Sequence, residues 1–176
     1  MLILVCGLPG TGKSFVAKEI AKNLPKTALL RTDVVRKNLL KKPNYTEEEK
    51  KLIYDSLLSE AGKFLSINKN CVLDATFYKR GYREAAKRLA SENGTQLLLI
   101  ECVCPESLVL KRLKKRKGDA SEADVAVYKK VKEYYEKITE RHITINTGKG
   151  KAEVRREIKN LSRTYNLFAY SNASEK

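Results

Sequence analysis

The chain has 176 residues, of which 42% are hydrophobic and 32% charged, and this balance excludes an intrinsically disordered protein. Lys and Arg number 36 against 21 Asp and Glu, so the formal net charge is +15. Such a charge attracts anionic partners, whether nucleotides, nucleic acid or an anionic surface. No stretch approaches the ~20 apolar residues that cross a bilayer, and the short first apolar run lacks the basic region of a signal peptide. We therefore expect a cytoplasmic protein without a membrane partner.

The pattern along the chain alternates between strands and helices. We predict strands over residues 2–6, 27–31, 71–75, 96–103 and 143–146. We predict helices over residues 11–23, 34–40, 46–68, 82–93, 105–115, 122–141 and 152–164. Asp33 is expected to N-cap the second helix, and Thr46 with Glu49 resembles a capping box at the start of the third.

This alternation predicts an α/β fold with a five-stranded parallel sheet and helices on both faces. A single domain would occupy residues 1–164, and residues 165–176 would form a C-terminal tail without periodicity. The four cysteines lie in apolar runs without a C-x-x-C pair, so we expect buried, reduced thiols. The sequence leaves the oligomeric state open.

The residues from Gly7 to Ser14 form the most specific motif in the chain. They read G-x-x-x-x-G-K-S between an apolar strand and a helix, which is the pattern of a phosphate-binding P-loop. Backbone N–H groups of such a loop surround phosphate oxygens, and the helix that follows contributes its positive end. Lys13 would reach the β- and γ-phosphates, and the Ser14 hydroxyl would bind Mg²⁺.

Ligands of parallel α/β sheets bind at the carboxyl ends of the strands, so the residues after each strand should share one crevice. After the second strand, Asp33 and Arg36 lie three residues apart on one helix face. Asp33 could accept a proton from an attacking hydroxyl, and Arg36 could bind an anionic substrate. An N-capping Asp beside a surface Arg is the alternative interpretation.

Three further groups of residues complete the predicted crevice. Asp74 ends the third strand, where an acid can orient Mg²⁺, and Arg80 and Arg83 follow at helical spacing as candidate substrate-binding residues or a solvated helix end. Asn146 and Thr147 follow the fifth strand and could contact the adenine or its ribose. Taken together, the predicted ATP-binding residues are Gly7, Leu8, Pro9, Gly10, Thr11, Gly12, Lys13, Ser14, Phe15, Asn146 and Thr147.

A basic run precedes a Gly-Asp break in the chain. Six of the seven residues from Lys111 to Lys117 are basic, and Arg112 and Arg116 are four apart and share a helix face. Before such a break, this layout is typical of a mobile lid, here about residues 112–122. An arginine of the lid could stabilise the charge on a transferring phosphoryl group.

Across residues 1–147 the sequence resembles the small P-loop kinases of the polynucleotide kinase and zeta-toxin-like group, which have AAA-type ATP-binding domains. The resemblance rests on the P-loop, on Thr32-Asp33-x-x-Arg36, on Leu73-Asp74-Ala75-Thr76 with its two arginines, and on Arg112-x-x-x-Arg116. It implies that Asp33 is the general base and that Arg36 binds a substrate phosphate. It also implies that Arg116 or Arg112 contacts the transferring phosphate.

The sequence therefore predicts an ATP- and Mg²⁺-dependent kinase. Lys13, Asp33 and a lid arginine would be its catalytic residues, with Ser14 and Asp74 at the metal. The basic surface favours the 5′-hydroxyl of RNA or DNA as the acceptor. A kinase for a small metabolite or an antibiotic-like molecule and a non-catalytic nucleotide-binding module are the alternatives.

Overall fold

The computed structural model describes residues 1–41, 43–115 and 123–164. The part of the chain that it describes contains β1 (Leu2–Cys6), β2 (Thr27–Arg31), β3 (Asn70–Asp74), β4 (Leu97–Val103) and β5 (Ile143–Asn146). These strands pair in the order β2-β3-β1-β4-β5, and all pairs are parallel. The five-stranded parallel sheet predicted from the sequence is confirmed.

Helices connect these strands, as parallel pairing requires. They are α1 (Lys13–Lys22), α2 (Thr32–Leu39), α3 (Glu47–Ser66), α4 (Arg80–Glu92), α5 (Glu106–Lys115), α6 (Val125–Glu133) and α7 (Lys151–Thr164), with a 3₁₀ turn, η1, at Thr147–Lys149. No helix within the described residues is both long enough and apolar enough to span a membrane.

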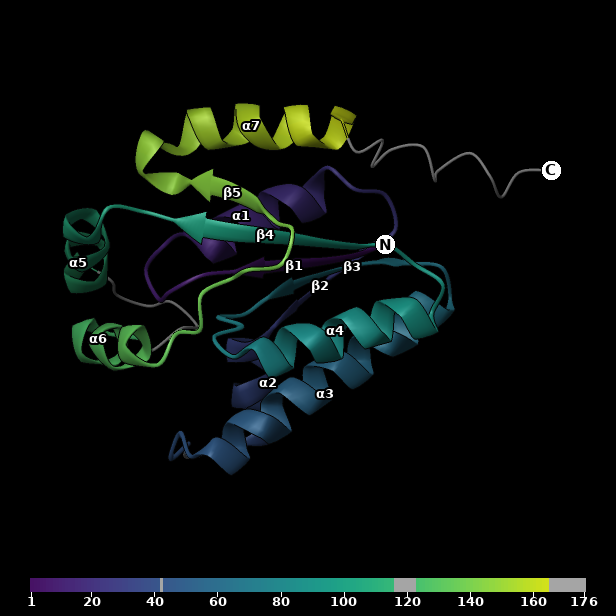
Figure 1. Ribbon diagram of the computed structural model, residues 1–176, viewed down its shortest axis with the longest axis horizontal. Helices are drawn as coiled ribbons and strands as arrows, with labels where there is room; N and C mark the ends of the chain where they lie inside the picture. The colour runs from purple at the N-terminus through teal and green to yellow at the C-terminus, as the bar shows by residue number, and fades with distance from the viewer. Residues whose placement is uncertain (42, 116–122, 165–176) are drawn as a thin grey trace.

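The sheet separates two layers of helices. Figure 1 shows α1 and α7 over one face and α3 and α4 over the other, while α5 and α6 lie beside the carboxyl end of β4. Along β1 the side chains alternate between the layers: Leu2 and Leu4 pack with Leu57 of α3, whereas Ile3 and Val5 pack with Val16 of α1. This alternation follows from the two-residue period of a strand, and it buries β1 completely.

The helix predicted over residues 122–141 is shorter in the structure. The helix α6 ends at Glu133, and the chain then runs in a non-helical path to β5. A tertiary hydrogen bond holds this path, because the Glu136 N–H donates to the Tyr78 carbonyl at 2.8 Å. Ile138 is buried in the core between the sheet, α3 and α4. The apolar residues whose spacing predicted a longer helix therefore belong to two separate packing surfaces, one in α6 and one in the segment after it.

Two predictions about helix starts have different outcomes. Thr46 caps α3 as predicted, because its side chain accepts the N–H of Glu49 at 3.2 Å. The prediction that Asp33 caps the second helix is wrong, because α2 begins at Thr32 and its N-cap position is Arg31. Asp33 lies in the first helical turn, where its carboxylate is free to pair with another side chain.

The core makes a direct stability prediction on α3. Leu57 is fully buried in the core under the sheet, whereas Leu52 of the same helix is 51% exposed. Leu57→Ala leaves a cavity and should lower the free energy of unfolding by about 2–5 kcal/mol. Leu52→Ala should change it by less than about 0.5 kcal/mol. Urea denaturation of both variants measures the difference, and equal effects would contradict this placement of α3.

Candidate active site

The P-loop leaves β1 and turns sharply into α1. Gly7, Gly10 and Gly12 have φ angles of +130°, +79° and +90°, which side-chain-bearing residues rarely adopt. Gly7 also lies so close to the Cys102 carbonyl that an added Cβ would collide with the backbone of β4. The glycines predicted from the motif are therefore required both by the turn and by the close packing of the loop.

Lys13 lies at the first residue of α1 and folds back over the loop. Its Nζ donates to the Leu8 carbonyl at 2.9 Å, and the Thr11 hydroxyl donates to the same oxygen at 2.8 Å. Burial lowers the pKa of Lys13 below its ordinary value, and the nearby Asp74 carboxylate opposes that shift. Phosphate oxygens would favour the charged form further, because they add negative charge at the same place.

Ser14 and Asp74 converge on the guanidinium of Arg31. The Arg31 Nε donates to Asp74 Oδ2 at 3.0 Å, and its Nη2 donates to the Ser14 hydroxyl at 3.1 Å. The Asp74 side chain is only 5% exposed and that of Arg31 12% exposed. Arg31 was not singled out from the sequence. The signal that could have found it is its position as the last residue of β2, directly before the predicted acid–arginine pair.

Asp33 and Arg36 form an ion pair at the start of α2, with Arg36 Nη1 donating to Asp33 Oδ1 at 3.1 Å. The Arg36 guanidinium also lies over the Tyr45 ring, 5.2 Å from its centroid. Tyr45 belongs to the loop before α3, whose N–H groups at Asn44 and Tyr45 donate to the Glu49 carboxylate. Asp33 and Arg36 thus share a face as predicted.

Arg112 links the end of α5 to the turn after β5. Its Nη1 donates to the Thr147 hydroxyl at 2.9 Å and its Nη2 to the Thr147 carbonyl at 2.8 Å. The Thr147 hydroxyl in turn donates to the Thr11 carbonyl of the P-loop at 2.6 Å. These bonds hold Arg112 beside the P-loop. The prediction for Arg116 and most of the predicted lid lies outside the described residues.

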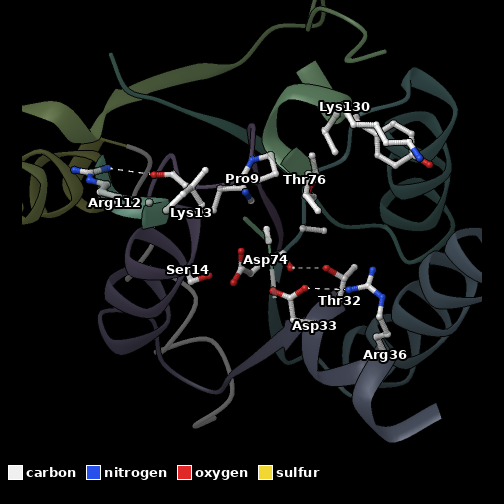
Figure 2. Close-up of a pocket in the computed structure, with 18 of the residues that line it drawn as sticks. Pro9, Lys13, Ser14, Thr32, Asp33, Arg36, Asp74, Thr76, Arg112 and Lys130 are labelled. Atoms are coloured by element: carbon white, nitrogen blue, oxygen red, sulfur yellow. Dashed lines mark hydrogen bonds and ion pairs between the residues drawn. The ribbon is translucent and has the colours of Figure 1, made fainter. Parts of the chain in front are cut away.

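One pocket of about 640 Å³ collects most of the predicted residues. Figure 2 shows Lys13, Ser14, Asp74 and Asp33 along it, with Arg112 toward one end and Arg36 and Lys130 toward the other. Phe15 and Thr147 also line it. Its wall further includes four tyrosines and three lysines that sequence reasoning missed: Tyr45, Tyr54, Tyr78, Tyr134, Lys50, Lys130 and Lys151.

Six of the predicted site residues that the structure describes are not among those that line this pocket: Gly7, Leu8, Thr11, Asn146, Arg80 and Arg83. Asn146 uses its side chain to accept the Gly148 N–H at 2.9 Å. Arg80 is exposed and pairs with Glu84 at 3.8 Å. Arg83 is 3% exposed and donates to the Glu140 carboxylate at 2.8 Å and the Phe77 carbonyl at 2.9 Å. This burial inside the protein favours a structural role for Arg83 over substrate binding.

Solved structures share this architecture. Kti12 from Chaetomium thermophilum, in complex with ADP-AlF3, matches with a TM-score of 0.72 at 15% identity, over 93% of this chain and 98% of that chain. A gluconokinase from Sinorhizobium meliloti matches with a TM-score of 0.65 at 22% identity, over 97% of each chain. These likenesses show that the chain has the same fold as these two P-loop proteins.

Sequence comparison shows the family to which the chain belongs. A family model described as an AAA domain matches residues 2–138, and the chain belongs to that family. The L-seryl-tRNA(Sec) kinase of Methanococcus maripaludis is 31% identical over 119 residues, which are 64% of this chain and 44% of the relative. An uncharacterized protein of Mycobacterium tuberculosis is 28% identical over 138 residues, which are 72% of this chain and 28% of the relative. The chain thus spans less than half the length of these curated relatives.

The placement of Arg83 generates a prediction that separates structure from substrate binding. Arg83→Ala removes the partner of Glu140 and leaves the Phe77 carbonyl without this donor, so the free energy of unfolding should fall by about 3 kcal/mol. Arg80→Ala, on the exposed side of the same helix, should change it by less than about 0.5 kcal/mol. Thermal and urea unfolding measure both variants. A fully stable Arg83→Ala protein with impaired acceptor binding would restore the substrate-binding interpretation.

Proposed function

We propose that the protein transfers the γ-phosphate of ATP to a hydroxyl group of a small acceptor. The observation that carries this proposal is that one pocket is lined both by P-loop residues, which suit a nucleotide polyphosphate, and by Asp33, which suits a general base. A module that only binds nucleotide would have no need for a second acid, besides Asp74, in the pocket that holds the P-loop residues.

The predicted residues of the pocket have separate chemical roles in this proposal. The loop N–H groups and the Lys13 ammonium bind the phosphates of ATP and stabilise the charge that spreads over the transferring group. Asp33 accepts the proton of the acceptor hydroxyl, and Arg36 holds the Asp33 carboxylate in position through its 3.1 Å bond. Arg112 braces the turn at Thr147 against the P-loop on the nucleotide side.

The donor set at Ser14 and Asp74 fits Mg²⁺. A hydroxyl and a carboxylate are hard oxygen ligands, and they already converge on one cationic group, Arg31. Ser14 would bind the ion directly, and Asp74 would orient it. When bound, the ion supplies charge neutralisation at the β- and γ-phosphates.

The identity of the phosphate acceptor is the second part of the proposal. Relatives and structural neighbours named as gluconokinase and L-seryl-tRNA(Sec) kinase favour a small hydroxyl group, free or carried on a larger molecule. They support this reading better than the 5′ end of a polynucleotide, although the net charge of +15 also suits RNA. A transfer screen with labelled ATP over metabolites and 5′-hydroxyl oligonucleotides separates the two, because only binding to a polymer should weaken steeply with salt.

The role of Asp33 makes the sharpest prediction about catalysis. Asp33→Asn removes the proton acceptor and should lower kcat by about 10²–10⁴-fold, with little change in the affinity for ADP. The matched control is Asp55→Asn, because Asp55 lies on the exposed face of α3 and pairs only with Lys51 among the interactions described. Steady-state transfer and ADP titration measure both. Wild-type turnover of Asp33→Asn would refute the base assignment.

A further inference from the structure

The far side of the pocket from Arg112 is lined by charged and aromatic side chains from several elements. We call it the acceptor wall and define it by Arg36, Tyr45, Lys50, Lys130 and Tyr134. Arg36 comes from α2, Tyr45 from the following loop and Lys50 from α3. Lys130 comes from α6, and Tyr134 follows it. Asp33 lies on the same side of the pocket, so the proposed acceptor hydroxyl and this wall share one space (Figure 2).

The charges of this wall do not balance. Arg36 is matched by Asp33 at 3.1 Å, and Lys50 by Glu47 at 2.8 Å. The Glu47 carboxylate, hydrogen-bonded by Lys50 and Lys79, has its pKa lowered to about 2 and stays ionised. Lys130 pairs with no carboxylate within the described part of the chain. The acids among the described pocket residues are Asp33 and Asp74, and each already has an arginine partner.

The same wall offers flat apolar surface. Tyr45 is 44% exposed, and the Arg36 guanidinium lies over its ring. The Lys50 ammonium lies over the Tyr78 and Tyr134 rings, at 5.5 and 5.2 Å from their centroids. Burial raises the pKa of Tyr78 above its ordinary value, so this ring remains neutral. Aromatic faces of this kind bind planar groups, and a wall for an uncharged sugar would need more hydrogen-bond acceptors than this one offers.

We propose that the acceptor is a small hydroxyl compound with a planar ring and an anionic group, and that Lys130 binds that anionic group. This inference rests on the proposed kinase function. The hydroxyl of the acceptor would lie at Asp33, and its ring would contact Tyr45 or Tyr134. Its phosphate, sulfate or carboxylate would form an ion pair with the Lys130 ammonium. Lys130 is then a specificity-determining residue for the reaction.

The test compares four probes with ADP and Mg²⁺ bound: uridine 3′-monophosphate, uridine, gluconate and glucose. Calorimetric titration should give the tightest binding for uridine 3′-monophosphate, which is both planar and anionic. Lys130→Gln should weaken it by roughly tenfold or more and leave uridine unchanged. Lys129→Gln is the matched control, because Lys129 neighbours Lys130 on α6 and does not line the pocket.

Two results would overturn the proposal: binding of the charged and neutral probes with equal affinity, or an unchanged affinity of Lys130→Gln for uridine 3′-monophosphate. Because ADP cannot donate a γ-phosphate, the titration reports binding alone. Failure of the kinase function itself would be seen separately, as the absence of transfer from ATP to any acceptor in the screen.

A different observation, the position of Arg31, carries a second inference. Its guanidinium donates to the Ser14 hydroxyl and to the Asp74 carboxylate, the two groups that fit Mg²⁺. The Asp74 side chain is only 5% exposed in this arrangement. A divalent ion bound by the Ser14 and Asp74 oxygens would lie next to the Arg31 guanidinium. The two cations would repel each other, because both would be bound by the same oxygens.

We infer that Arg31 is a positioning residue that competes with the divalent ion for Ser14 and Asp74. The phosphates of a bound nucleotide add negative charge at this point, so metal binding becomes strong only together with the nucleotide. Because of this competition, binding of the ion depends on the nucleotide rather than on the concentration of the free ion.

Electron paramagnetic resonance of Mn²⁺, used as the probe without nucleotide, tests this competition. Arg31→Gln should bind Mn²⁺ at least about tenfold more tightly than the wild type, because Asp74 loses its cationic partner. Arg88→Gln removes the same charge from an exposed position on α4 and should bind Mn²⁺ as the wild type does. Arg31→Lys keeps the charge but loses the simultaneous hydrogen bonds to Ser14 and Asp74, so its affinity for Mn²⁺ should be intermediate. Unchanged or weaker Mn²⁺ binding by both Arg31 variants would refute the competition.

Discussion

The parallel register at the centre of the sheet is the constraint on which the site depends. Asp74 pairs with Val5 of β1 on one side and with Arg31 of β2 on the other. The same register ends β1 at the P-loop and β2 at the start of α2, so the P-loop and the Asp33–Arg36 pair lie at one edge of the sheet. A slip of one residue in β3 would turn Asp74 to the opposite face, away from Ser14.

Electrostatics at this edge follow from pairing rather than from net charge alone. Arg31 and Asp74 form an ion pair across the ends of β2 and β3, and Arg36 and Asp33 form a second ion pair within α2. Because both acids are matched, the further cations of the pocket give it a positive potential. That potential suits a nucleotide polyphosphate at the P-loop and a second anion opposite it.

Local patterns were sufficient to predict the sheet, the P-loop and the acids at the strand ends, because each depends on residues close together in sequence. They failed where a distant contact decides the outcome. Arg83 has helical spacing with Arg80, yet its guanidinium is buried against Glu140, which is far along the chain. The segment after α6, which was predicted to be helical, instead donates the Glu136 N–H to the Tyr78 carbonyl, and no local period encodes this contact.

The sequence by itself determined the P-loop half of the site, since Gly7–Ser14 carries its own backbone geometry, Asp74 ends β3 and Asp33 comes two residues after β2. Only the tertiary structure decided the acceptor wall and the position of Arg31. Tyr45 and Lys130 are 85 residues apart in the chain numbering and face one pocket because α6 and the loop before α3 pack at the same edge of the sheet. Whether such distant side chains line the same pocket depends on how the helices pack on the sheet, and neither composition nor periodicity specifies that packing.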